Sequence, residues 1–139
     1  PDFEDVWLFL HLLFELIWKY RFLYRDLNDL LSRNRLIEVR FKQLLAHEVR
    51  TARLLCDGLV AQGQMAAGAA QIEALALNMA VLATYWLSFE FVRDPRRGDE
   101  SEALLRGIYQ VMTLIAPFLT GRGRKLFDRL AARYVSDTD

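Results

Sequence analysis

The chain has 139 residues, the length of one domain, and 53% of them are hydrophobic, which excludes a disordered chain. Lysine and arginine total 18, as do aspartate and glutamate, so the formal net charge is zero. A domain that binds nucleic acid alone is usually strongly basic, so we expect no direct DNA binding by residues 1–139. A single cysteine excludes an internal disulfide framework.

Leucine and alanine outnumber valine, isoleucine and threonine by 40 to 18, a ratio that favours helix over sheet. Apolar residues recur at helical spacing in segments separated by short breaks. We therefore predict one all-α domain, an antiparallel bundle of about six helices without a strand. The expected helices cover residues 2–24, 25–32, 35–62, 69–92, 101–119 and 124–134.

The breaks carry residues that start and stop helices. Asp2 and Asn34 can accept hydrogen bonds from free amides at helix starts. Gly63 is expected in the left-handed conformation that ends a helix. Pro95 ends the expected helix 69–92, and Pro117 kinks or shortens the next one.

Three uncharged runs raise the question of a membrane span, but the longest has 16 residues and a spanning helix needs about 20. We interpret the runs as buried helices. The expected helix 69–92 is apolar on all sides, which predicts a central position covered all round. We expect a cytoplasmic protein that makes no membrane contact, and the lone Cys56 is compatible with that compartment.

Catalytic and metal-binding patterns are weak in this sequence. His11 and Glu15 lie one helical turn apart, the minimum spacing for two metal ligands, but no third ligand stands at a suitable spacing. We interpret them as a half-buried hydrogen-bonded pair and Cys56 as a core residue. The glycine-containing segment 120–125 lacks the strand and the lysine–hydroxyl pair of a phosphate loop, and reads as a solvated basic turn. We predict no enzyme, no metal and no cofactor.

Aromatic residues make up 12% of the chain and concentrate in the first and fourth expected helices. Core packing explains any one of them. So many in a small domain also predict an aromatic-lined cavity, because ligand pockets are mostly apolar with a few polar anchors. The predicted ligand-binding residues are Trp7, Phe14, Trp18, Asn78, Tyr85, Trp86, Phe89 and Met112.

Residues 18–27 form a cluster of tyrosines and arginines. Tyr20 and Tyr24 are four residues apart, and so are Arg21 and Arg25, so each pair shares a helical face if the helix continues. One interpretation is a helix end at which the guanidinium groups meet carboxylates and terminal carbonyls. The other is a polar corner over a ligand cavity. The sequence favours the first.

The last two expected helices carry apolar residues on more than one face. Burial within the chain is one explanation. A two-fold dimer is the other, and it is the commonest symmetric assembly. We predict that these helices join two copies of the chain, with an interface formed by Leu105, Ile108, Tyr109, Met112, Phe127, Leu130 and Tyr134.

The run WKYRFLYRDL at residues 18–27, followed by Leu30, Leu31 and Phe41, resembles the effector-binding half of TetR-type bacterial transcriptional repressors. It is most similar to the subgroup marked by a YRFxYRDL segment. The order of the expected helices fits as well: a long apolar helix, a short one, a long amphipathic one, a buried one and a final pair.

This resemblance implies a homodimer held by a four-helix bundle, made by the last two helices of each copy. It implies a small hydrophobic or aromatic effector in a cavity among the first five helices. Effector binding would shift the first helix and change the spacing of two DNA-reading units, which must match the half-sites on DNA. We expect DNA contact only through an N-terminal domain absent from this chain, which starts at Pro1. The alternative is a free-standing helical protein–protein interaction module.

Overall fold

The computed structural model describes residues 2–96 and 100–138, which form seven α-helices and one 3-10 turn. Across these residues there is no strand, and a single isolated bridge pairs Met65 with Leu119. The predicted all-α class is confirmed. The elements are α1 (Phe3–Lys19), α2 (Arg21–Arg25), α3 (Leu27–Arg33), α4 (Arg35–Ala61), α5 (Ala69–Arg93), α6 (Glu100–Ile115), η1 (Ala116–Phe118) and α7 (Gly121–Thr138).

The first expected helix is divided in two, which accounts for seven helices where about six were predicted. Tyr20 leaves helical geometry at φ −108° and ψ 32°, and α2 starts at the next residue. The Arg21 guanidinium donates to the carbonyl oxygen of Trp18 at 3.2 Å and lies 4.9 Å from the centre of the Trp18 ring. Arg21 thus satisfies a carbonyl of the last turn of α1, as the helix-end interpretation predicts.

The predicted start and stop residues are confirmed. The Asp2 carboxylate accepts from the backbone of Glu4 at 2.9 Å and caps α1. The Asn34 side chain accepts from the N–H of Ile37 at 3.1 Å and caps α4. Gly63 adopts φ 72° just beyond α4, a conformation that costs glycine no steric clash.

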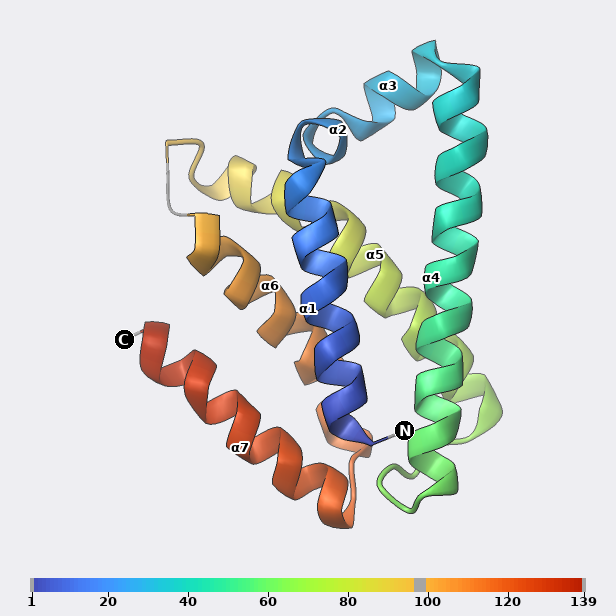
Figure 1. Ribbon diagram of the computed structural model, residues 1–139, viewed down its shortest axis with the longest axis vertical. Coiled ribbons are helices and arrows are strands. Elements are labelled where there is room, and N and C mark those ends of the chain that lie inside the picture. The colour runs from blue at the N-terminus through green and yellow to red at the C-terminus, as the bar shows by residue number, and fades with distance from the viewer. Residues whose placement is uncertain (1, 97–99, 139) are drawn as a thin grey trace.

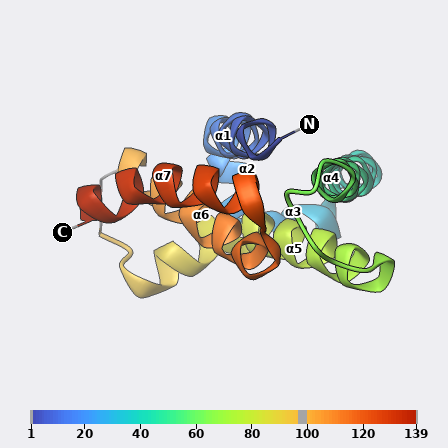
Figure 2. The same ribbon diagram turned by 90° about the horizontal axis from the view of Figure 1, so that it is seen from below.

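Helix α1 lies at the centre of the face seen in Figure 1, with α4 on one side and α7 on the other. Helices α5 and α6 lie behind it, as the view from below confirms (Figure 2). An apolar helix is stable only where other elements cover it. The buried side chains of α1 are accordingly numerous: Phe3, Val6, Leu10, Leu13, Phe14 and Ile17.

Three distant segments meet at Gln64, in the loop between α4 and α5. Its side-chain oxygen accepts from the N–H of Phe3 at 3.2 Å, and its carbonyl accepts from the N–H of Thr120 at 2.9 Å. Gly123 lies against the same carbonyl so closely that a Cβ at this position would collide with it. These contacts hold the start of α1 and the start of α7 at one end of the molecule.

Helix α5 is buried along one side only, so the prediction that it is covered all round is wrong. Its uncovered face carries a row of exposed apolar side chains, which we call the α5 stripe. The α5 stripe consists of Leu77, Val81, Tyr85, Phe89 and Val92.

By length and composition alone, α5 could cross a membrane, and 50% of its most apolar 18-residue window is buried inside the domain. The core helix of a soluble protein passes the same test, so this is weak evidence for a membrane span.

Close packing of α6 against α1 and α5 depends on Gly107. A Cβ at this position would lie 2.5 Å from the Phe14 ring and 2.6 Å from the Trp86 ring. Both rings belong to buried side chains, so neither has room to move aside.

We predict that Gly107→Ala lowers the free energy of unfolding by about 1–3 kcal/mol, because overpacking outweighs the better helix propensity of alanine. Urea denaturation followed by circular dichroism measures this. The control is Gly68→Ala, where the added methyl meets only the Gln71 side chain at 3.8 Å and the expected cost is below about 1 kcal/mol. Equal stability of Gly107→Ala and the native chain would contradict the packing argument.

Candidate functional site

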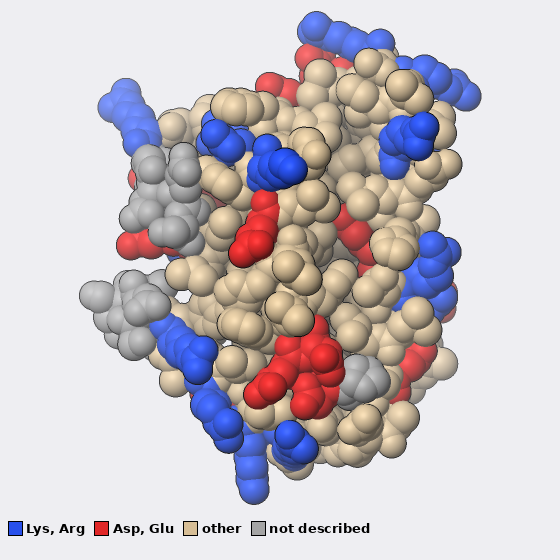
Figure 3. Space-filling model, in the orientation of Figure 1, with Lys and Arg blue, Asp and Glu red and all other residues tan. Residues whose placement is uncertain are grey.

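A cavity of about 330 Å³ opens between α1, α2 and α4, near the end of the molecule where α2 and α3 join α1 to α4. Figure 3 shows the surface hollowed between these elements. Small-molecule sites have volumes of about 300–1,000 Å³, so this cavity suits a small ligand. Its lining is almost entirely apolar and consists of Leu16, Tyr20, Leu23, Tyr24, Leu36, Ile37, Arg40, Phe41 and Leu44.

The connection from α1 to α4 through α2 and α3 explains why this cavity exists. Helix α4 runs back alongside α1, and the short helices α2 and α3 bridge the two (Figure 1). The lining residues of α4 recur at helical spacing and share one face. Tyr24 packs edge-on against Phe41, with the ring centres 5.6 Å apart, so the cavity wall is a packed aromatic surface. Tyr20 and Leu36, both exposed, belong to the same lining.

Arg40 is the one charged side chain of the lining, and it is exposed. It makes no hydrogen bond or ion pair within residues 2–96 and 100–138. Water therefore solvates this guanidinium.

Glu48 follows Leu44 by one turn of α4 and is 6% exposed. Its Oε1 has no hydrogen-bond partner within the described chain. Burial raises the pKa of the Glu48 carboxyl to about 7. Burial also raises the pKa of Tyr24, and the charge of Glu48 adds to that effect, so the carboxylate acts on a residue of the cavity wall.

The surroundings of Glu48 are apolar. It lines a void of about 10 Å³, roughly the space for one water molecule. The sequence analysis missed Glu48. Glu48 comes four residues after Leu44 and four before Ala52, so helical spacing places it on the face of α4 that carries core residues. This spacing could have predicted its burial. The other residues that line this void are Phe9, Leu10, Leu13, Ala52, Met79 and Ala80.

None of the eight predicted ligand-binding residues lines the 330 Å³ cavity. Trp7 is half-buried and donates from Nε1 to the Tyr134 hydroxyl at 2.8 Å. Phe14 and Trp86 pack at Gly107, and Met112 is fully buried. These residues lie where α1 and α5 meet α6 and α7.

The other four predicted ligand-binding residues lie in two places. Trp18 is half-buried, with the Arg21 guanidinium 4.9 Å from the centre of its ring. Asn78, Tyr85 and Phe89 are exposed on α5. The part of the lining that the sequence analysis did single out is the tyrosine and arginine cluster, because Tyr20 and Tyr24 both line the cavity.

Five of the seven predicted dimer-interface residues are buried within one chain. The Phe127 ring packs edge-on against Phe3 at 5.8 Å, and Tyr134 packs against Trp7 and His11 of α1. Contacts inside the chain therefore account for their burial. The five are Ile108, Met112, Phe127, Leu130 and Tyr134, whereas Leu105 and Tyr109 are half-buried.

The Tyr134 hydroxyl joins α7 to α1. It accepts from Trp7 Nε1, and its oxygen lies 2.6 Å from Nε2 of His11. The tautomer of His11 decides whether the hydroxyl donates to this nitrogen or accepts from it. Burial lowers the pKa of His11, an effect that the Glu15 charge partly opposes. In the part of the chain that the structure describes, no group of three metal-binding side chains stands near His11 or elsewhere.

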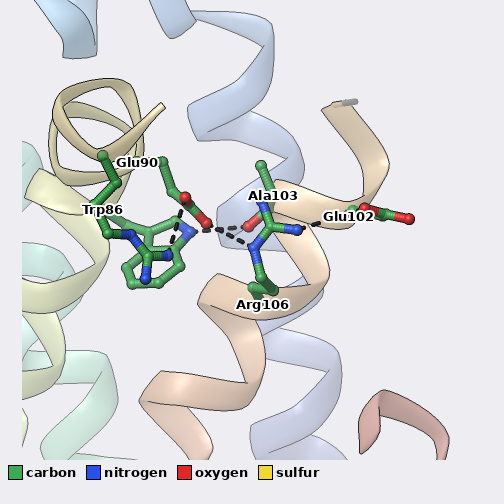
Figure 4. A network of polar contacts seen from close by, with 6 residues as sticks. Trp86, Glu90, Glu102, Ala103 and Arg106 are labelled. Atoms are coloured by element: carbon green, nitrogen blue, oxygen red, sulfur yellow. Dashed lines mark hydrogen bonds and ion pairs between the residues drawn. The ribbon is translucent and has the colours of Figure 1, made fainter. Parts of the chain in front are cut away.

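A second buried carboxylate, Glu90, holds α5 to α6 (Figure 4). It accepts from Arg106 Nε at 2.7 Å and from Arg93 at 3.0 Å. Burial acts to raise the pKa of Glu90, but the two arginines outweigh it and the net direction is downward. Trp86 Nε1 donates to the carbonyl of Ala103 at 2.8 Å across the same contact (Figure 4). Both oxygens of Glu90 are thus paired, Nη2 of Arg106 has no hydrogen-bond partner among the described residues, and the ion pairs fasten the two helices together.

A known protein family matches this chain. The family profile described as TetR, bacterial transcriptional repressor, covers residues 1–127, so the chain belongs to the TetR family of bacterial transcriptional repressors. The family consists of transcriptional regulators, which are generally not enzymes.

A solved structure agrees with this assignment. The crystal structure of a TetR-family transcriptional regulator from Marinobacter aquaeolei VT8 superposes with a TM-score of 0.83 at 26% sequence identity. The match covers 96% of this chain and 64% of that regulator, so this chain spans less than two thirds of its length. No curated protein matches the sequence.

We predict that Glu48→Gln stabilises the chain relative to the native protein as the pH rises. The folded state holds the Glu48 proton up to a pKa of about 7, whereas the pKa of a free glutamate side chain is 4.5. The native chain therefore loses stability as the pH rises between these values, and the glutamine variant does not. From pH 5 to pH 8 the difference in unfolding free energy should grow by about 2–3 kcal/mol in favour of Glu48→Gln.

Chemical denaturation at several pH values measures this difference. The control is Glu73→Gln on the exposed side of α5, which should show no such trend. A constant difference between Glu48→Gln and the native chain across this range would contradict a buried, unpaired carboxyl.

Proposed function

We propose that this chain is the effector-sensing and dimerising part of a TetR-type transcriptional regulator, of the YRFxYRDL subgroup. The observation that carries the proposal is the apolar cavity between α1, α2 and α4, in a chain of this family. The effector is a small molecule with an apolar body, because the lining offers little but hydrocarbon and aromatic surface. The protein is cytoplasmic and contacts DNA through a domain on the N-terminal side of α1.

The position of α1 supports a route from the cavity to such a domain. Leu16 in the last turn of α1 and Leu23 and Tyr24 of α2 border the cavity, and the first turn of α1 leads to the N-terminus (Figure 1). A ligand that fits one position of α1 better than another shifts the balance between the two positions. In a dimer, that shift changes the distance between two DNA-reading units.

Dimer formation is part of this proposal. The α5 stripe supplies an uncovered apolar surface, and large exposed patches of this kind mark interaction sites. Leu105 and Tyr109 are the residues of the predicted interface that are only half-buried in one chain. We assign the two-fold contact to the α5 stripe together with Leu105 and Tyr109.

The same stripe also favours a second candidate, a helical protein–protein interaction module. In that case the α5 stripe receives a different protein, and the chain alone is a monomer.

Filling the cavity tests the sensing function. We predict that Leu44→Trp lowers the affinity for 1-octanol at least tenfold, because the larger side chain occupies the ligand's space. Isothermal titration calorimetry measures the affinity. The control is Val39→Trp, which adds the same group to the exposed side of α4 outside the lining. Octanol binding that is absent from the native chain, or unaffected by Leu44→Trp, would contradict a ligand site in this cavity.

Sedimentation tests the dimer. We predict that Val81→Glu, in the α5 stripe, raises the dimer dissociation constant at least a hundredfold, because it buries an unpaired charge at a cost of about 3 kcal/mol or more. The control is Leu54→Glu on α4, at a residue that is 60% exposed compared with 53% for Val81. A native chain that sediments as a monomer at all concentrations would favour the interaction module instead.

A further inference from the structure

The carboxyl group of Glu48 lacks the partner that buried charged groups ordinarily have. The side chain is 6% exposed and its Oε1 has no hydrogen-bond partner among the described residues. Buried carboxylates in folded proteins are paired or hydrogen-bonded, because an unpaired one loses its hydration without compensation. Glu90 in the same molecule shows the ordinary arrangement, with an arginine on each oxygen.

No cation faces Glu48 from the elements packed around it. Helix α1 presents Phe9, Leu10 and Leu13, and α5 presents Met79 and Ala80. The titratable neighbour that responds to its charge is Tyr24 of α2, which is itself an acid. Within the described chain, therefore, no positively charged group is available to pair with the Glu48 carboxylate.

Glu48 lies close to the ligand cavity along α4. Leu44 lines the cavity, and Glu48 lies one turn further on the same face of α4, about 6 Å along the helix axis at 1.5 Å per residue. Tyr24 lines the cavity and also senses the Glu48 charge. Glu48 thus lies one helical turn from the lining of an apolar space.

We propose that Glu48 anchors the effector, and that the effector is a hydrophobic amine in its ammonium form. The apolar body of the amine fills the cavity between α1, α2 and α4, and its ammonium group pairs with the Glu48 carboxylate. This inference rests on the proposed function of the cavity as a ligand site. The cavity volume of about 330 Å³ equals the space of about eleven water molecules in the liquid, which suits an amine of about that many non-hydrogen atoms.

The exposed Arg40 and the small void beside Glu48 both affect which ligand charge the cavity favours and how the ligand reaches Glu48. Arg40, the cation of the lining, is exposed, and exposed ion pairs contribute little because water screens them. It therefore gives an anionic ligand only a weak advantage. The void beside Glu48 holds about 10 Å³, so an ammonium group enters by moving a neighbouring side chain, and the flexible Met79 is the one suited to yield.

Three probes with the same tail test the proposal: octylammonium, 1-octanol and octanoate, titrated calorimetrically into the native chain at pH 8. The expected order of affinity is octylammonium first and octanoate last. Glu48→Gln should weaken octylammonium at least tenfold and change 1-octanol less than twofold. The matched control, Glu73→Gln, removes the same charge from the exposed side of α5 and should change neither.

The pH dependence of octylammonium affinity gives a second test, because a purely structural role of Glu48 would not change it. Octylammonium should bind the native chain several-fold more weakly at pH 5.5, where Glu48 is protonated, and the Glu48→Gln variant equally at both pH values. Carboxyl NMR of the native chain gives a second measurement that does not depend on a variant. Saturating octylammonium should lower the pKa of Glu48 by at least one unit.

The outcomes separate this inference from the function on which it rests. If 1-octanol binds and Leu44→Trp blocks it, but Glu48→Gln keeps full affinity for octylammonium, Glu48 is not the anchor and the cavity remains a ligand site. If octanoate binds more tightly than octylammonium, the ligand class is wrong. If none of the three probes binds, the anchor and the ligand function both fail.

Discussion

The structure depends on the burial of α1, a helix too apolar to be stable when it is exposed to water. Its core side chains face α4, α5, α6 and α7, so most of the domain is arranged around it. The tightest of these contacts is with α6, where Gly107 lets the rings of Phe14 and Trp86 approach the backbone. Polar groups also hold α1 at two places: Gln64 accepts from the N–H of its first residue, and the Tyr134 hydroxyl bonds to Trp7 and His11 within the helix.

The two sides of α1 differ in how closely they are packed. Towards α6, Gly107 lets the rings of Phe14 and Trp86 pack against the backbone, and five of the residues predicted as an interface are buried in α6 and α7. Towards α4 the bridge formed by α2 and α3 leaves the 330 Å³ cavity.

Two buried carboxylates show how surroundings decide the role of a residue. Glu90 receives two arginines, its pKa is lowered, and it serves as a link between α5 and α6. Glu48 is surrounded by hydrocarbon, and burial raises its pKa to about 7. Both oxygens of Glu90 have arginine partners within the described chain, whereas Oε1 of Glu48 has none. That difference is the physical reason to look for a ligand at Glu48.

The sequence by itself determined the helical class, the caps at Asp2 and Asn34, the stop at Gly63 and the family, because periodicity, capping chemistry and the WKYRFLYRDL run are local properties. The spacing of apolar residues also showed which face of each helix is apolar, but not which neighbouring helix covers that face. Only the tertiary structure decided that Tyr134 and Phe127 face α1, that the α5 stripe is uncovered, and that the space lies beside Tyr20 and Tyr24. Burial of Glu48 was likewise decided there, because the cost of an unpaired charge depends on how three helices pack around it.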